Sequence, residues 1–189
     1  MPAENTFDRP IIPANERERL AALARYEQVR DLPDGAFNHI AQMAVRLFDV
    51  PIAVVNLVGA EVVRTIAGEG ELAVGTEIVR GVSLCSLAVL SDEPTVFENA
   101  LEEPCLLMNP LVTGSFGLGF YAAAPLRTPD GFNIGAVCLV DKQPRVFTAG
   151  EQKVLEGLAQ IVMEDMEARF PPSSRQVAAA PAQGASDAR

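Results

Sequence analysis

The sequence predicts an α+β domain with a mainly antiparallel sheet, helices on one face, and the first and last helices beside each other. Two observations predict the sheet: the apolar, β-branched runs at 50–58 and 132–141, and a Thr-Pro-Asp-Gly turn at 128–131. A third predicts the helices, because apolar residues at helical spacing occur near both ends of the chain. The predicted order is helix, helix, strand, strand, helix, strand, loop, strand, strand, helix.

Length and composition fit one globular domain of ordinary size. The chain has 189 residues, of which 49% are hydrophobic and 21% charged. A chain of this length buries about 70% of the surface that its unfolded form exposes, so it needs no disulfide or metal to hold a core. No apolar run reaches the roughly 18 residues of a membrane span, and the acidic N-terminus does not resemble a signal peptide. We therefore expect a soluble, cytoplasmic protein.

Charge and histidine content exclude several functions. The 25 acidic residues outnumber the 15 basic ones and give a formal net charge of -10. Nucleic acids and anionic membranes bind clustered Lys and Arg, so we expect neither as a partner. A catalytic Ser-His-Asp triad, a multi-histidine zinc site and a two-histidine iron site each need more or better-placed histidine than His39 provides. We expect no metal.

The chain divides into three parts. Residues 1–14 contain three prolines and are expected to form a flexible arm. Residues 15–170 carry the helix and strand patterns and form the domain. Residues 171–189 are rich in Ala, Pro, Ser and Gln and poor in bulky apolar side chains, so we expect a disordered tail.

Two helices are predicted before the first strand. Asn15 and Glu18 have capping-box spacing, which predicts a helix over 16–30. Its apolar stripe is thin and rich in alanine, which favours contact with another helix over burial in a core. Asp34 can cap the second helix, whose apolar residues keep strict helical spacing: Phe37, Ile40, Ala41, Ala44, Leu47 and Phe48.

The middle of the chain predicts short elements and loops. Residues 50–58 and 61–67 read as paired strands, and 68–81, with four glycines and no clear period, reads as a loop. Three further segments follow: a short helix capped by Ser83 over 83–91, a strand over 94–98, and a crossover with at most one helical turn over 100–119.

The last third of the chain carries the clearest signals. Residues 120–127 and 132–141 are strands of a hairpin, and Pro125 predicts a bulge or an unpaired edge because it cannot donate a ladder hydrogen bond. Thr148 with Glu151 forms a second capping box, which opens the longest helix. The apolar stripe of that helix comprises Val154, Leu155, Leu158, Ile161, Val162 and Met166.

Three segments together resemble a known family of sensory domains. They are VPIAVVNLV at 50–58, GVSLCSLAVLSDEPTVFENALEEP at 81–104, and NPLVTGSFGLGFYAAAPLRTPDGFNIGAVCLVDKQPRVFTAGEQKVLEGLAQIV at 109–162. Their order and spacing are similar to bacterial GAF domains, in particular the sensor modules that precede histidine kinases and diguanylate cyclases. The resemblance spans about residues 15–170. It implies a central antiparallel sheet of about five or six strands, a small-molecule pocket between one sheet face and the connecting loops, and dimers built through the terminal helices.

The departures from the family exclude its common cofactors. Similar sequences often carry Cys-x-His at the short helix, whereas Cys85 begins Cys-Ser-Leu, and Val63 and Arg64 stand where an aromatic pair is expected. The signature of GAF domains that bind cyclic nucleotides is missing, and no cysteine has the setting that bilin attachment needs. Haem would depend on His39 alone, which lies off the apolar stripe of its helix. We expect no cofactor.

The cysteines raise an enzymatic alternative. Free methionine-(R)-sulfoxide reductases share the GAF fold, and Cys85 in RGVSLC resembles the position of one of their cysteines, with Cys105 in the following loop where another would sit. Such an enzyme needs a thiolate to attack the sulfoxide and a second thiol to resolve the sulfenic acid. The first turn of a short helix favours a Cys85 thiolate, whereas the neighbouring Leu84 and Leu87 raise the pKa of the thiol.

Core packing is the competing interpretation of all three cysteines, because free cysteine is among the most buried residue types. Cys105 lies beside Glu102 and Glu103, which disfavour a thiolate, and it is out of register with the reactive cysteine of the family. Cys138 alternates with apolar residues on one face of its strand and is expected to pack in the core.

We therefore expect a stand-alone, non-catalytic GAF sensor or regulatory module that binds a small molecule. The alternatives are a reductase that uses Cys85 and Cys105, and a purely structural dimerisation module whose pocket is filled by its own side chains. Asn56, the one polar residue in an apolar strand, needs a partner, either the ligand or a backbone group of the neighbouring loop. The predicted ligand-binding residues are Asn56, Leu84, Cys85, Phe97, Leu107, Phe116, Tyr121 and Ala123.

A homodimer is expected, with its signal passed to a separate signalling protein or to a further part of a longer chain. The first helix offers only Leu20, Leu23 and alanines, too little to form a core alone. In the last helix Ile161 and Val162 point about 100° apart and can serve two surfaces. Pairing these helices across a two-fold axis would cover the second surface.

Overall fold

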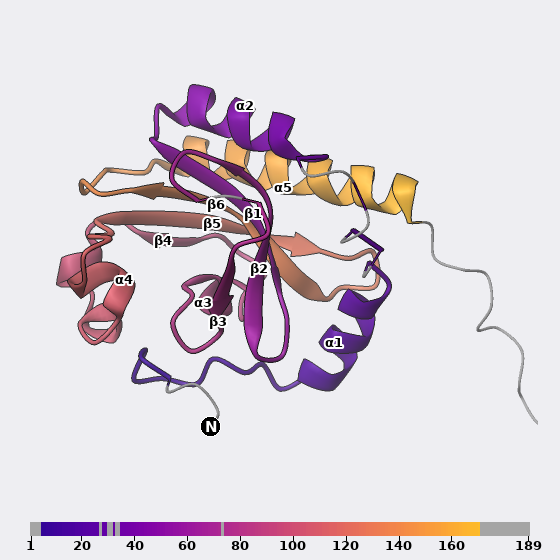
Figure 1. Cartoon of the computed structure of the whole chain (residues 1–189), viewed down its shortest axis with the longest axis horizontal. Helices are drawn as coiled ribbons and strands as arrows, with labels where there is room; N and C mark the ends of the chain where they lie inside the picture. The colour runs from indigo at the N-terminus through magenta and orange to yellow at the C-terminus, as the bar shows by residue number, and fades with distance from the viewer. Residues whose placement is uncertain (1–4, 27, 30–31, 33–34, 73, 171–189) are drawn as a thin grey trace, which may run out of the picture.

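Six antiparallel strands form one sheet at the centre of the molecule (Figure 1). The computed structural model describes residues 5–26, 28–29, 32, 35–72 and 74–170. The strand order is β3-β2-β1-β6-β5-β4, which confirms the predicted α+β class. The strands are β1 (Ile52–Val58), β2 (Val62–Glu69), β3 (Glu77–Val79), β4 (Thr95–Phe97), β5 (Phe120–Arg127) and β6 (Asn133–Asp141).

Helices cover both faces of the sheet. Two long helices, α2 (Asn38–Phe48) and α5 (Ala149–Arg169), lie beside each other on one face (Figure 1). The short helix α1 (Glu16–Ala24) lies at the end of the sheet against β6, and Tyr26, just after it, bonds to Glu167 of α5. The opposite face carries the short turns α3 (Cys85–Ala88), η2 (Ala100–Glu102), η3 (Pro104–Leu106) and α4 (Pro110–Thr113).

The two central strands are buried on both faces, which explains their nearly continuous apolar runs. Along β6, Val137 and Leu139 join the core beneath α2 and α5, whereas Ala136 and Cys138 join the core beneath α3. Successive side chains of a strand point to opposite faces, so the predicted burial of Cys138 is confirmed.

The hairpin and the final helix match their sequence signals. Gly131 has φ +92°, and its amide donates to the Thr128 carbonyl in the turn between β5 and β6. Thr148 and Glu151 form the predicted capping box at the start of α5. Among the described residues, β4 pairs with Tyr121 to Ala123 only, so Pro125 lies beyond β4 as an edge residue, as expected.

Several helix ends differ from prediction. Asn15 makes no side-chain cap at α1, because its backbone (φ -97°, ψ 27°) lacks the extended conformation typical of an N-cap. The helix ends at Ala24 rather than near residue 30. Asp34 lies outside the described residues, and Phe37 occupies the N-cap of α2. Ser83 is not the cap of α3, whose N-cap is Leu84.

Two segments predicted as loops contain regular structure. Residues 77–79 form β3, which pairs with Val62 to Arg64 of β2 at the edge of the sheet. An exposed strand of three residues has too few side chains to show an alternating pattern. The crossover over 100–119 holds three short helical turns rather than one at most, again too short to produce a helical period.

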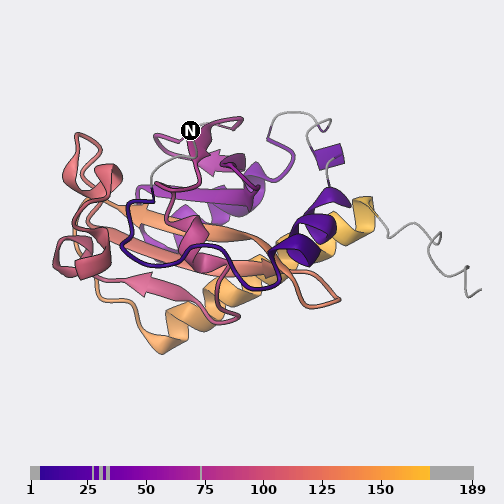
Figure 2. The same cartoon turned by 90° about the horizontal axis from the view of Figure 1, so that it is seen from below.

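Residues 5–14 pack against the domain, which corrects the expected flexible arm for this part of it. Phe7 is fully buried and Ile11 is 7% exposed, both in the core beneath α3. The Thr6 amide and hydroxyl donate to the Gly81 carbonyl, and the side chain of Asn109 donates to Thr6. Figure 2 shows this indigo segment crossing the sheet face that carries α3. The remainder of the predicted arm and the tail over 171–189 lie outside the described residues.

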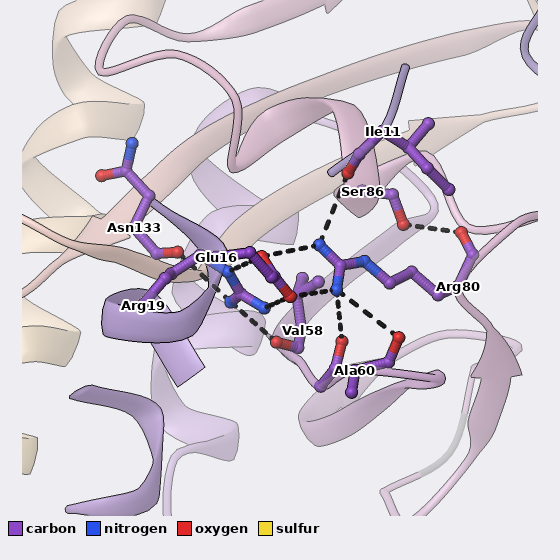
Figure 3. Close-up of polar contacts among 9 residues, drawn as sticks. Ile11, Glu16, Arg19, Val58, Ala60, Arg80, Ser86 and Asn133 are labelled. Carbon is purple, nitrogen blue, oxygen red and sulfur yellow. Dashed lines mark hydrogen bonds and ion pairs between the residues drawn. The ribbon is translucent and has the colours of Figure 1, made fainter. Parts of the chain in front are cut away.

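A buried ion network fixes α1 to the end of the sheet (Figure 3). The Arg19 guanidinium, 1% exposed, donates from Nε and Nη2 to the two carboxylate oxygens of Glu16, at 2.8 and 2.9 Å. Its Nη1 donates to the Val58 carbonyl at 2.8 Å, at the end of β1. Arg80, which precedes α3, donates to the same Glu16 carboxylate and to the Gly59 carbonyl.

Glu16→Gln should lower the free energy of unfolding by about 3 kcal/mol, because it leaves two buried arginines without a carboxylate. Urea denaturation followed by circular dichroism measures the change. Glu18→Gln, exposed on the same helix, is the matched control and should change stability by less than about 0.5 kcal/mol. Equal effects of the two substitutions would contradict the role given to Glu16.

The difference in stability between the wild type and Glu16→Gln should depend on pH. Burial acts to raise the pKa of Glu16, but the hydrogen bonds and charges of Arg19 and Arg80 outweigh it and lower the pKa. A carboxylate with a lowered folded-state pKa contributes its full stability above the ordinary glutamate pKa of about 4.3 and loses it as the pH falls through the folded value. The wild type and Glu16→Gln should therefore converge in stability in acid.

Candidate functional site

Four buried polar side chains meet between α3 and the centre of the sheet. The Cys85 sulfur of α3 lies 3.4 Å from the Cys138 sulfur of β6. The Tyr121 hydroxyl of β5 lies 3.4 Å from each of the two sulfurs. The side-chain nitrogen of Asn56, on β1, donates to Cys85 at 3.1 Å. We call Asn56, Cys85, Tyr121 and Cys138 the sulfur cluster.

The strand register brings the cluster together. In the ladder, β6 lies between β1 and β5, and Cys138 is paired with Val54 of β1 and Ala123 of β5. Asn56 and Tyr121 are each two residues from these partners, so all three side chains point to the same face. Helix α3 contacts β1, β5 and β6 and places Cys85 over them. The cluster therefore rests on three rigid neighbouring strands.

The sulfur cluster is closed to solvent. Cys138 is fully buried, and Cys85, Tyr121 and Asn56 are 2%, 3% and 4% exposed. The side-chain oxygen of Asn56 is buried without a hydrogen-bond partner among the described residues. A buried acceptor without a partner costs free energy, so the Asn56 amide is only partly satisfied by its contact with Cys85.

Hydrogen bonds decide which sulfur is the more acidic. Contacts from Cys138, Tyr121 and Asn56 lower the pKa of Cys85 to about 6, against the opposing effect of burial. Burial raises the pKa of Cys138 well above its ordinary value, and the proximity of Cys85 adds to this. Burial also raises the pKa of Tyr121. The apolar neighbours expected to raise the Cys85 pKa are thus outweighed by donors that lie far away in the sequence.

The structure gathers most of the predicted ligand-binding residues on one face. Asn56, Cys85 and Tyr121 are in direct contact, and the Phe97 and Tyr121 ring centroids lie 6.3 Å apart. The Asn56 side chain donates to the Cys85 sulfur and not to a backbone group of the described residues, which is one of the two partners expected from the sequence. The predicted residues in or packed against the core beneath α3 are Leu84, Cys85, Phe97, Phe116, Tyr121 and Ala123.

The structure changes the expectations for Leu107 as a ligand-binding residue and for Cys105 as the partner of Cys85. Leu107 is 52% exposed and stands outside that core. Cys105, in η3, is partly buried at the edge of the core, and the sulfur in contact with Cys85 is that of Cys138. The contact between Cys85 and Cys138 could not be predicted from the sequence, because the two residues are 53 positions apart. The alternation along β6 indicates only which face of the sheet Cys138 lies on.

Two hollows lie elsewhere on the surface. One, of about 640 Å³, is bordered by Glu98, Glu102, Glu103 and Arg145, and the Glu98 carboxylate there accepts from the Phe147 amide. The other, of about 600 Å³, lies between α5 and the edge of β5 around Pro125.

Neither a metal site nor a membrane span is found in the part of the chain that the structure describes. No three His, Cys, Asp or Glu side chains gather there as metal ligands would. None of the described helices is long and apolar enough to cross a membrane.

Comparison with proteins of known sequence identifies a signalling enzyme as a relative. The chain is 29% identical over 158 residues to a cyclic di-GMP phosphodiesterase of Pseudomonas aeruginosa. The match covers 82% of this chain and 26% of the relative, so the chain spans about a quarter of that enzyme.

Comparison with solved structures shows the same fold in proteins of different activity. A type II free methionine-R-sulfoxide reductase from Thermoplasma acidophilum superposes with a TM-score of 0.59 at 18% identity, over 77% of this chain and 97% of that one. A GAF domain from an Acinetobacter phosphoenolpyruvate-protein phosphotransferase gives a TM-score of 0.58 at 15% identity, over 80% of this chain and 94% of that one. The GAF domain family model matches residues 33–164, and with this shared fold it shows that the chain belongs to the GAF domain family.

Proposed function

We propose that this chain is a regulatory GAF module, which receives a small-molecule signal on the sheet face beneath α3 and catalyses no reaction. The observation that carries this proposal is the alignment with the phosphodiesterase. Most of this chain is matched by a segment that makes up 26% of that enzyme. This pattern of alignment, in which one domain matches about a quarter of a larger enzyme, is expected for an input module that is a separate domain of that enzyme.

The closed geometry of the sulfur cluster supports a sensor more than an enzyme. A sulfoxide reductase must admit its substrate to a thiolate, yet Cys85 is 2% exposed, with Phe7 of the N-terminal segment in the same core. Its sulfur contacts Cys138 rather than Cys105, the second cysteine that the enzymatic alternative requires. A signal that changes the contacts of buried groups can shift a domain between two packing arrangements, and a sensor works in this way.

The outer surface of the helical face supports a dimer as the output. Val154 and Ile161 of α5 are 47% and 45% exposed, and Met43 and Leu47 of the neighbouring α2 are 42% and 57% exposed. An isolated domain leaves these apolar side chains in water, and a second copy related by a two-fold axis would cover them. Leu23 of α1 instead packs partly against the domain's own core, so the structure favours α5 and α2 as the contact.

A chimera tests the regulatory proposal. Residues 5–170, which include the N-terminal segment with the buried Phe7, replace the matched segment of the Pseudomonas phosphodiesterase, and cyclic di-GMP hydrolysis is measured by chromatography. The chimera should hydrolyse the substrate, and Asn56→Ala should change its rate by about fivefold or more through the coupling of input to output. Met108→Ala, at a residue 78% exposed, is the matched control and should leave the rate unchanged.

Two results would contradict the proposal. One is a chimera whose rate responds to neither Asn56→Ala nor Tyr121→Phe. The other is activity of the chain alone: with a thioredoxin-type reductant it should not turn over free methionine sulfoxide, and turnover lost in Cys85→Ser or Cys105→Ser would favour the reductase.

Sedimentation tests the dimer. The wild type should sediment as a dimer at micromolar concentration, and Ile161→Glu should weaken the dimer because it places a charge in the apolar contact. Leu23→Glu should weaken it less, since Leu23 faces inward. Met108→Glu, an equally polar change away from α5, should leave the dimer intact. A wild-type monomer at these concentrations would rule out the helical interface.

A further inference from the structure

The sulfur cluster holds two thiols in contact, and the regulatory proposal gives them no chemistry. Their sulfur atoms lie 3.4 Å apart, and a disulfide holds two sulfurs at about 2.0 Å. Bond formation would draw them together by about 1.4 Å. Both lie on well-packed elements, Cys138 in the central strand β6 and Cys85 in α3. The short helix is the element that can move.

We propose that Cys85 and Cys138 form a reversible disulfide when hydrogen peroxide oxidises them, and that this bond is the signal that the module receives. The inference rests on the proposed function, because it names the input of that regulatory module. The disulfide itself is a property of the chain alone and is measured separately. Cys105 has no part in it.

The reaction balances in two steps. The Cys85 thiolate attacks one peroxide oxygen, the O–O bond breaks, and the hydroxide that leaves takes up the proton that Cys85 released, giving water and a sulfenic acid. The Cys138 sulfur then attacks the sulfenic sulfur, an S–S bond forms, the S–O bond breaks, and a second water carries away the Cys138 proton. Two thiols and one peroxide thus become a disulfide and two waters.

The neighbours of Cys85 suit it to the first step. Asn56 donates to its sulfur at 3.1 Å, and the Tyr121 hydroxyl donates at 3.4 Å. Donors to a sulfur stabilise its thiolate, which is the form that attacks peroxide. Tyr121 also touches Cys138, so its hydroxyl stays beside both sulfurs as the bond forms.

In this proposal, local opening of the N-terminal segment admits the oxidant to the core that contains the thiols. Phe7 and Ile11 belong to the core that contains Cys85. Three hydrogen bonds of Thr6 hold that segment in place: its amide and hydroxyl donate to the Gly81 carbonyl, and Asn109 donates to its hydroxyl. Hydrogen peroxide is small and uncharged and can enter when this segment opens locally.

A chain of contacts runs from Ser86, the residue after Cys85, to α1 (Figure 3). Ser86, next to Cys85, donates its hydroxyl to the Arg80 carbonyl at 2.6 Å. The Arg80 guanidinium in turn binds the Glu16 carboxylate at the start of α1. Movement of α3 toward β6 therefore pulls on the residue that anchors α1.

Mass spectrometry of the full chain tests the disulfide. The protein is treated with hydrogen peroxide, denatured, alkylated with iodoacetamide, and digested with trypsin and a glutamate-specific protease. Trypsin alone leaves Cys85 and Cys105 on one peptide, because no Lys or Arg lies between Arg80 and Arg127, but cleavage after Glu98 or Glu102 separates them. The expected product is a cross-link between the Cys85 and Cys138 peptides, with Cys105 alkylated, and a dithiol should reverse it.

The cysteine variants act as matched controls. Cys105→Ser should give the same cross-link, whereas Cys138→Ala and Cys85→Ser should give none, with circular dichroism confirming that each variant is folded. A cross-link between Cys85 and Cys105, or three alkylated thiols in the peroxide-treated wild type, would overturn the proposal. The wild-type result decides the matter even where a variant does not fold.

Hydrogen exchange tests the relay, by which we mean the contacts that run from Ser86 through Arg80 to Glu16 of α1. The chimera tests the signalling role of the disulfide. Oxidation should speed amide exchange in α1, and unchanged exchange would overturn the relay through Arg80. Peroxide should change cyclic di-GMP hydrolysis in the chimera at least about fivefold and leave the Cys138→Ala chimera unaffected. A wild-type chimera that is cross-linked but unresponsive to peroxide, while Asn56→Ala still changes its rate, would overturn the disulfide as input and leave the regulatory function standing.

Discussion

One carboxylate, Glu16, holds together three parts of the chain that meet at the end of the sheet. It accepts from Arg19 of its own helix and from Arg80 before α3, and both arginines also bind backbone carbonyls at the end of β1 and in the turn that follows. Two guanidinium groups this deeply buried are tolerated only with a negative partner and satisfied donors. The position of α1 and of the segment before α3 therefore depends on this single side chain.

The α3 face is organised by the same requirement that buried polar groups be paired. Arg80 fixes the chain before α3, Ser86 bonds back to it, and the first helical residue, Cys85, is then set over the central strands. There Asn56, Tyr121 and Cys138 meet its sulfur. The strands are rigid and doubly covered, whereas α3 has only four residues, so a change at the sulfurs is expressed as movement of α3 rather than of the sheet.

The sequence predicts local features of the fold well. The Thr148–Glu151 capping box, the turn at Gly131 and the inward face of Cys138 each depend on residues within a few positions of one another. Their chemistry is complete in a short window, so a pattern can reveal it.

The features that define the candidate site depend on distant residues and could not be predicted in the same way. The Glu16–Arg80 contact joins residues 64 apart, and the contact of the two sulfurs joins residues 53 apart. Nothing near Phe7 indicates that it is buried, because the core that covers it comes from β1, β5 and α3.

Hydrogen exchange in reduced wild type and Glu16→Gln, resolved by peptide, tests most directly whether Glu16 unites α1 with the α3 segment. The account predicts that residues 16–24 and 80–88 lose protection together in the variant, while α2 and the central part of α5 keep theirs. Loss of protection in α1 alone, with residues 80–88 unchanged, would contradict it.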